Sequence, residues 1–173
     1  MLKSTINFPI NSLSNSKINY MKAVQTPCIG ICSTTSLGDA VCRGCKRYSF
    51  EVINWNSYDD VAKSAVLSRI EKLICQILGN KLQIFSVPNL KKGLEKAKIP
   101  YDPSLSPYCW LHNLLKKNHQ KIDNLREYGV CALPEFSDVS LTALSETVER
   151  ELLVLCEAHF NRYFELPGGN DRT

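Results

Sequence analysis

The sequence predicts a mostly α-helical protein, with an irregular four-cysteine metal-binding loop at the front and at most one or two short strands. Three observations support this fold class. Four cysteines and three glycines crowd into residues 28–45. Apolar residues then recur at helical spacing in several long segments. Of the 173 residues, 44% are apolar, which is enough to form a buried core.

We expect three parts along the chain. Residues 1–23 are rich in Ser and Asn and predict a disordered tail. Residues 24–79 contain the clustered cysteines and predict a cysteine-rich metal-binding module with helices. Residues 80–173 predict a helical C-terminal domain.

Capping residues and apolar periodicity define two helices of the cysteine-rich module. A short helix follows Ser49 as its N-cap, with Ile53 among the residues that face inward. A longer helix is expected over residues 58–78, where Ser57 and Asp60 form a capping box and Gly79 ends the helix. Its expected inward stripe consists of Val61, Ala65, Ile70, Leu73, Ile74 and Ile77.

The second half of the chain reads as helices joined by proline-rich or glycine-rich turns. Residues 82–87 alternate weakly between apolar and polar and predict one strand. Asn89 is the expected N-cap of the next helix, and Ser106 followed by Pro107 predicts the start of another. The helices are expected over residues 90–98, 107–117, 123–128 and 140–164.

The net charge of +4 conceals an uneven distribution. Residues 80–121 hold eight Lys or Arg against two Asp or Glu, whereas residues 122–173 hold four against ten. The basic segment could contact nucleic acid. The favoured interpretation is that it faces the acidic C-terminal part within the same fold, because no nucleic-acid-binding motif accompanies the lysines.

The composition narrows the class of protein. No run of about 18 apolar residues predicts a membrane-spanning helix, and the first 20 residues lack the apolar stretch of a secretory signal. We therefore expect a cytoplasmic protein without membrane association, whose thiols stay reduced. Four clustered cysteines then indicate a metal rather than disulfides.

The spacing of the clustered cysteines is the strongest chemical signal in the chain. Cys28 and Cys32 are four residues apart, Cys42 and Cys45 are three apart, and a short loop joins the two pairs. Such pairs can place four thiolates around one ion and typify structural zinc. These four cysteines are the predicted metal ligands.

The residues around the cysteines fit the same interpretation. Gly30 and Gly44 allow the turns that aim backbone N–H groups at sulfur. Arg43, Lys46 and Arg47 offset part of the negative charge that four thiolates bring. The spacing differs from common ferredoxin patterns and favours zinc, but an iron–sulfur cluster stays open because thiolates hold both.

Part of the sequence resembles a small bacterial family. The resemblance lies in the stretch from Thr26 to Cys32, in Cys42-Arg43-Gly44-Cys45-Lys46-Arg47, and in a short helix that ends in Trp55. This part is similar to the domain of unknown function 1289, a family often labelled as predicted iron–sulfur proteins. The resemblance covers roughly residues 24–73. It implies the same four cysteine ligands and gives no function for residues 80–173.

A second, weaker metal site could combine two Cys/His pairs on predicted helices. Cys109 and His112 are three residues apart, as are Cys156 and His159, so each pair shares a helix face. The simpler interpretation is that both cysteines are buried small apolar residues, and Cys75 is expected to be structural as well.

We therefore expect a small metal-binding protein with a structural four-cysteine site that acts as a non-catalytic adaptor for a protein partner. No phosphate loop, nucleophile elbow or dinucleotide fingerprint points to an enzyme. The alternatives are an iron–sulfur protein in electron transfer or redox sensing, and a nucleic-acid-binding protein that uses residues 80–121.

Overall fold

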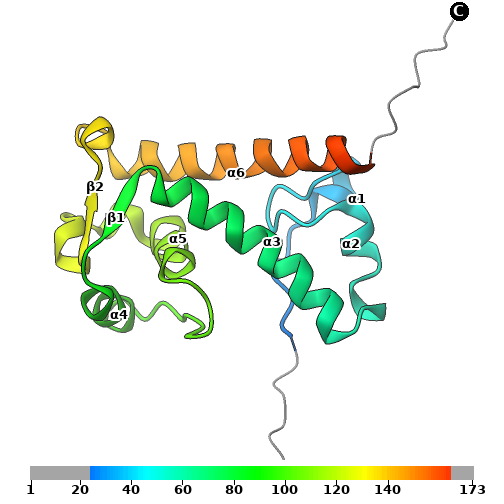
Figure 1. Cartoon of the computed structure of the whole chain (residues 1–173), viewed down its shortest axis with the longest axis horizontal. Coiled ribbons are helices and arrows are strands. Elements are labelled where there is room, and N and C mark those ends of the chain that lie inside the picture. The colour runs from blue at the N-terminus through cyan, green and yellow to red at the C-terminus, as the bar shows by residue number, and fades with distance from the viewer. Residues whose placement is uncertain (1–23, 165–173) are drawn as a thin grey trace, which may run out of the picture.

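The computed structural model describes residues 24–164, so the tail predicted over residues 1–23 lies outside the described part. The structure confirms the mostly α-helical class with two short strands (Figure 1). The α-helices are α1 (Ser33–Leu37), α2 (Ser49–Ile53), α3 (Asp60–Gly79), α4 (Val87–Lys96), α5 (Pro107–Asn118) and α6 (Leu141–Phe164). The strands are β1 (Leu82–Ile84) and β2 (Val130–Ala132).

Two long helices, α3 and α6, connect the two ends of the molecule (Figure 1). The cysteine loop with α1 and α2 lies at one end, and the strands with α4 and α5 lie at the other. Helix α6 runs along the top over both ends, and α3 crosses beneath it. None of the helices in residues 24–164 combines the length and apolar character needed to span a membrane.

The two strands form an antiparallel pair in which Leu82 lies opposite Ala132. The sequence predicted β1, although over a longer range, and gave no specific signal for β2. Gly129 precedes β2 with a left-handed φ of 71°. A Cβ at Gly129 would come within 2.3 Å of the Ser86 carbonyl oxygen, so only glycine allows the chain to pass there.

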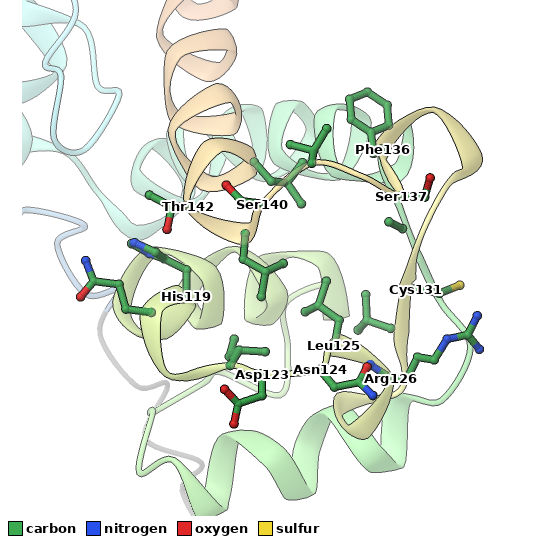
Figure 2. Close-up of a pocket in the computed structure, with 17 residues that line it drawn as sticks. His119, Asp123, Asn124, Leu125, Arg126, Cys131, Phe136, Ser137, Ser140 and Thr142 are labelled. Carbon is green, nitrogen blue, oxygen red and sulfur yellow. The ribbon is translucent and has the colours of Figure 1, made fainter.

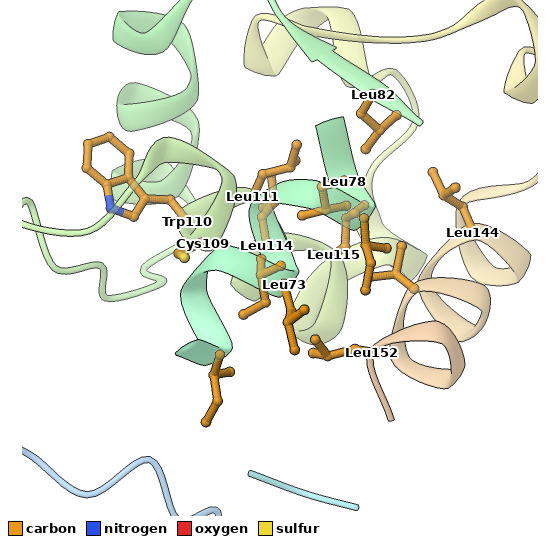
Figure 3. Close-up of a cluster of buried hydrophobic side chains, with 14 of the residues drawn as sticks. Leu73, Leu78, Leu82, Cys109, Trp110, Leu111, Leu114, Leu115, Leu144 and Leu152 are labelled. Carbon is orange, nitrogen blue, oxygen red and sulfur yellow. The ribbon is translucent and has the colours of Figure 1, made fainter. Parts of the chain in front are cut away.

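One buried cluster joins the elements of both ends. Leucines of α3, α5 and α6 form its centre (Figure 3), and Val41, Tyr48 and Trp55 of the cysteine-rich part belong to the same cluster. The boundary predicted at residue 79 coincides with the end of α3, but buried side chains from either side of it pack together. The division into two domains stays a prediction.

Several predicted helix starts are wrong by a few residues. Asp59 rather than Ser57 caps α3, and its carboxylate accepts a hydrogen bond from the Ala62 N–H at 2.7 Å. Ser86 rather than Asn89 caps α4, which therefore begins at Val87. In each case two polar residues that could serve as the N-cap lie within three positions of each other. The path of the backbone into the helix decides which of the two becomes the cap. The predicted start of α5 at Ser106 and Pro107 is confirmed.

The prediction of which residues face inward on α2 and on the first turns of α3 is also partly wrong. Ile53 is 75% exposed and Val61 is 78% exposed, and Ala65 is exposed as well. Burial on α3 begins at Val66 and continues through Leu78. Periodicity identifies the apolar side of a helix, but burial also requires a neighbouring element over that side.

The leucine cluster should carry much of the stability. Leu111 is fully buried, so Leu111→Ala is expected to lower the free energy of unfolding by about 2–5 kcal/mol, through lost burial and the cavity left behind. Ile53→Ala removes an exposed side chain and should change it by less than about 0.5 kcal/mol. Urea unfolding of both variants measures the difference, and equal effects would contradict the assigned core.

Candidate metal centre

A closed turn holds Cys42 and Cys45. The isolated bridge between Val41 and Tyr48 brings the two ends of the turn together. The Cys42 N–H donates to the Arg47 carbonyl at 2.8 Å, and the Lys46 N–H donates to the Cys42 carbonyl at the same distance. These backbone bonds fix both cysteines on one short loop, where each side chain is buried.

Hydrogen-bond donors surround the Cys42 sulfur. Burial alone would raise the pKa of this thiol, but backbone N–H groups of Cys45, Ser33 and Gly44 outweigh burial and lower the pKa from 9.0 to about 6. The Cys45 side chain also hydrogen-bonds to this sulfur. Such an arrangement stabilises a thiolate, which is the form that binds metals.

Cys45 lies in a different environment on the same turn. Burial raises the pKa of its thiol, and the Arg47 guanidinium partly opposes that increase by donating from Nε to the sulfur at 3.4 Å. The guanidinium also lies 4.6 Å from the Trp55 ring centroid. The arginine that the sequence assigned to charge compensation therefore contacts a predicted ligand directly.

The segment that carries Cys28 and Cys32 packs against this turn at Gly44. A Cβ at Gly44 would meet the Ile29 side chain at 2.8 Å and the Ile31 carbonyl oxygen at 3.3 Å. The Ser33 hydroxyl accepts a hydrogen bond from the Arg43 N–H at 2.9 Å. Glycine at position 44 therefore permits the close approach of the two cysteine segments.

The first cysteine pair is more open to solvent. Cys28 is exposed and its sulfur accepts a hydrogen bond from the Gly30 N–H at 3.5 Å, while Gly30 adopts a left-handed φ of 92°. Cys32 is half-buried at the N-cap of α1, and hydroxyls of Thr34 and Thr35 lower the pKa of its thiol. Within residues 24–164, no three of these four thiols lie within 4.8 Å of one another.

Cys42 and Cys45 are the half of the predicted donor set that the structure brings together. Two sulfurs lie in contact on a rigid turn, backbone N–H groups point at one of them, and the other cysteine segment lies against the same turn. These are the features that thiolate sites in proteins require from the surrounding backbone. The predicted set of four ligands remains a prediction.

Lys46 links the cysteine turn to α5 and α6. Its side chain is only 4% exposed, and its ammonium binds the Arg43 carbonyl at 2.6 Å and the Glu149 carboxylate at 2.8 Å. His112 Nε2 lies 2.6 Å from the other oxygen of Glu149, and the Lys116 ammonium lies 3.4 Å from the carboxylate. Lys46 also adopts a left-handed φ of 62°, which the surrounding contacts hold in place.

Comparison with known proteins concerns the same part of the chain. The family described as "Protein of unknown function (DUF1289)" matches residues 26–73. "Uncharacterized protein YdhL" of Escherichia coli O6:H1 is 43% identical over 61 residues, which cover 35% of this chain and 70% of the relative. The chain belongs to the DUF1289 family. The proteins of the same name from Escherichia coli K12 and Shigella flexneri are each 41% identical over 59 residues, which cover 34% of this chain and 72% of each relative.

The DUF1289 match includes the four clustered cysteines and ends within α3, which confirms the resemblance seen in the sequence. No solved structure is significantly similar to the chain. Lys46 belongs to the matched part, whereas its partner Glu149 lies far beyond it. The contact between the module and the later helices therefore lies outside what the family match describes.

The four residues of the weaker predicted site do not appear together as a close group of ligand atoms within residues 24–164. His112 pairs with Glu149, and His159 packs edge-on against the Tyr163 ring at 6.2 Å between centroids. Cys156 is buried beside the Arg69 guanidinium at 4.0 Å. Cys109 instead lies with Glu71 and Cys75, a grouping that the sequence analysis missed because its members come from two different helices.

A surface pocket of about 590 Å³ lies near the start of α6 (Figure 2). Ser140 and Thr142 lie at one end of it with His119. The guanidinium of Arg126 points away from the pocket. The His119 ring nitrogen Nδ1 is 2.8 Å from the Leu115 carbonyl. The pocket therefore shows no set of converging charged groups.

The basic segment meets the acidic C-terminal part at two lysines. Lys81 pairs with Glu151 at 2.7 Å, and Lys116 contacts Glu149. For Lys81 and Lys116, these pairs agree with the interpretation that the basic segment faces the acidic C-terminal part within the same fold. The remaining lysines of the segment are exposed, and they are Lys91, Lys92, Lys96, Lys98, Lys117 and Lys121.

Replacing Glu149 should leave the buried ammonium of Lys46 without its counter-charge and destabilise the fold. Glu149→Gln is expected to lower the free energy of unfolding at pH 7 by about 1–3 kcal/mol, less than for a fully buried pair because the Glu149 side chain is 26% exposed. Glu157→Gln, at an exposed position of α6, is the matched control. Urea unfolding measures both.

The same variant has an expected pH dependence. Burial would raise the pKa of Glu149, but hydrogen bonds from His112 and Lys46 outweigh it and hold the pKa far below its usual value. The depressed pKa contributes stability above the unfolded-state pKa of about 4.3, and this stability is lost as pH falls. The difference between wild type and Glu149→Gln should therefore shrink from pH 7 to about pH 3.5. A difference that stays constant would contradict this assignment.

Proposed function

We propose that the DUF1289 module of this chain binds one metal ion through Cys28, Cys32, Cys42 and Cys45, as a structural centre. The observation that carries the proposal is the closed turn that holds Cys42 and Cys45, where backbone N–H groups and the Cys45 side chain lower the pKa of the Cys42 thiol to about 6. An isolated buried thiol has no need of such donors, whereas a metal-bound thiolate does.

Zinc is the proposed metal, which when bound would cross-link the two cysteine segments. The short loops of this module bury little apolar surface of their own, since Ile29, Ile31 and Leu37 are 56%, 77% and 66% exposed. A cross-link through thiolates would supply the stability that such a loop lacks. Arg47 beside Cys45 and the clustered backbone N–H groups would offset part of the thiolate charge.

Removing one ligand tests the site. Wild-type protein purified without added chelator is expected to carry about one zinc in this module, and Cys42→Ser should lose it. Cys131→Ser, which changes a half-buried cysteine of β2, is the matched control and should keep it. Elemental analysis of both variants measures the change, and equal metal content would refute the assignment.

A second variant leaves all four thiols in place. Gly44→Val brings side-chain atoms against Ile29 and the Ile31 carbonyl, so it should weaken metal retention against a competing chelator by roughly tenfold. Gly79→Ala is the control, because a Cβ there meets only ordinary contacts at 3.9 Å.

Absorbance of anaerobically purified protein separates zinc from iron: a colourless sample supports zinc, and visible absorbance with bound iron supports the iron–sulfur alternative.

The proposed role of the metal-bound module is to present a rigid surface to a protein partner. Ile31 and Ile53 are 77% and 75% exposed on this module, and exposed apolar side chains favour contact with another protein. Ile31→Ser combined with Ile53→Ser is expected to keep the metal while reducing co-purification of a cross-linked partner. Unchanged recovery of every cross-linked partner would argue against this surface.

A further inference from the structure

A second group of metal-ligating side chains lies between α3 and α5, away from the cysteine loop. Glu71 and Cys75 are four residues apart on one face of α3, and Cys109 lies in the first turn of α5. Their ligand atoms all lie within 4.8 Å of one another. Figure 3 shows the Cys109 sulfur at the margin of the leucine cluster, next to Trp110.

We propose that Glu71, Cys75 and Cys109 form a metal-binding site that takes a thiophilic divalent cation such as zinc. Two thiolates and one carboxylate are ligand types that zinc accepts. Bond lengths of about 2.3 Å to sulfur and about 2.1 Å to oxygen place such donors roughly 3.5–3.8 Å apart around one ion. A small closure of the observed cluster is sufficient to reach that separation.

The start of α5 orients two of the three ligands. The Ser106 N–H donates to Glu71 Oε1 at 2.9 Å, which holds the carboxylate against the helix. The Cys109 N–H donates to the Ser106 carbonyl at 2.8 Å, so Ser106 positions both ligands through its backbone. Helix α5 has twelve residues, and its N-terminal end favours the negative charge that a thiolate at Cys109 carries.

The burial of the three side chains defines an accessible side. Cys109 is buried, whereas Glu71 and Cys75 are half-buried. Three protein ligands with one side open to solvent leave a fourth position for water or an external ligand, unlike a closed four-cysteine site. The bound cation would also cross-link α3 to α5 next to the core.

Cation binding must displace the proton of the Cys109 thiol. Burial, with the neighbouring Cys75 and Glu71, raises the pKa of the Cys109 thiol to about 12, so Cys109 is protonated at neutral pH when no cation is bound. The cation takes the place of each proton that the sulfurs carry, forms two metal–sulfur bonds and involves no change of oxidation state.

Zinc stoichiometry of the full-length chain tests this site independently of the cysteine loop. Reduced protein is loaded with zinc, freed of excess by gel filtration and assayed for bound metal. Cys75→Ser is expected to bind about one zinc fewer than wild type, and the Cys131→Ser control should bind as many as wild type. Glu71→Gln keeps both thiols and should release zinc to a competing chelator roughly tenfold more readily.

Further variants separate this site from the cysteine loop. Cys42→Ser removes a ligand of the loop only, and Cys42→Ser combined with Cys75→Ser should abolish both sites. Cobalt added to Cys42→Ser should give sulfur-to-cobalt absorbance that disappears in the double variant, while circular dichroism verifies that both are folded.

Equal zinc content in Cys75→Ser and Cys131→Ser would overturn the proposal, as would cobalt absorbance unchanged in the double variant. A Cys75–Cys109 disulfide that persists in reductant would overturn it too. Loss of one zinc in Cys75→Ser but none in Cys42→Ser would support this site and reject the loop site.

Discussion

The buried ammonium of Lys46 is the constraint on which the arrangement of this molecule depends. A charge with 4% exposure is unfavourable unless a counter-charge and hydrogen-bond acceptors surround it. Glu149 supplies the charge from α6, and His112 and Lys116 of α5 hold that carboxylate in place. The cysteine turn therefore cannot shift relative to these helices without leaving Lys46 uncompensated.

A second contact anchors the same turn to α3 and to the end of α6. The Arg69 guanidinium lies 3.7 Å from the Tyr48 ring centroid and pairs with Glu51 at 2.8 Å. Tyr48 also packs edge-on against Phe160 and Phe164 of α6, with centroids 5.3 and 5.4 Å away. Within the described part of the chain, every buried side-chain nitrogen or oxygen has a hydrogen-bond partner. The polar contacts beneath the turn are therefore satisfied, which favours one rigid arrangement.

The two proposed metal sites differ in the part of the structure that positions their ligands. The loop site rests on backbone N–H groups and on the glycine that lets two irregular segments approach. The site between α3 and α5 rests on side chains of two regular helices, and only its carboxylate and Cys109 are tied to the backbone of Ser106. A metal in the loop would stabilise a segment that buries little apolar surface. A metal between α3 and α5 would reinforce packing that already exists.

Local sequence determined the helices and the turn residues, because these depend on neighbours a few positions away. Pro107 after Ser106, the left-handed Gly129 and the spacing of the clustered cysteines all follow from the chain itself. Tertiary structure decided which face of each helix is covered, and Ile53 and Val61 stay exposed because no element of residues 24–164 packs over them. It also decided the partners across long separations: Lys46 meets Glu149 103 residues later, and Cys109 lies with Glu71 and Cys75 of α3. Such pairs depend on how whole helices pack, and no local spacing encodes that packing.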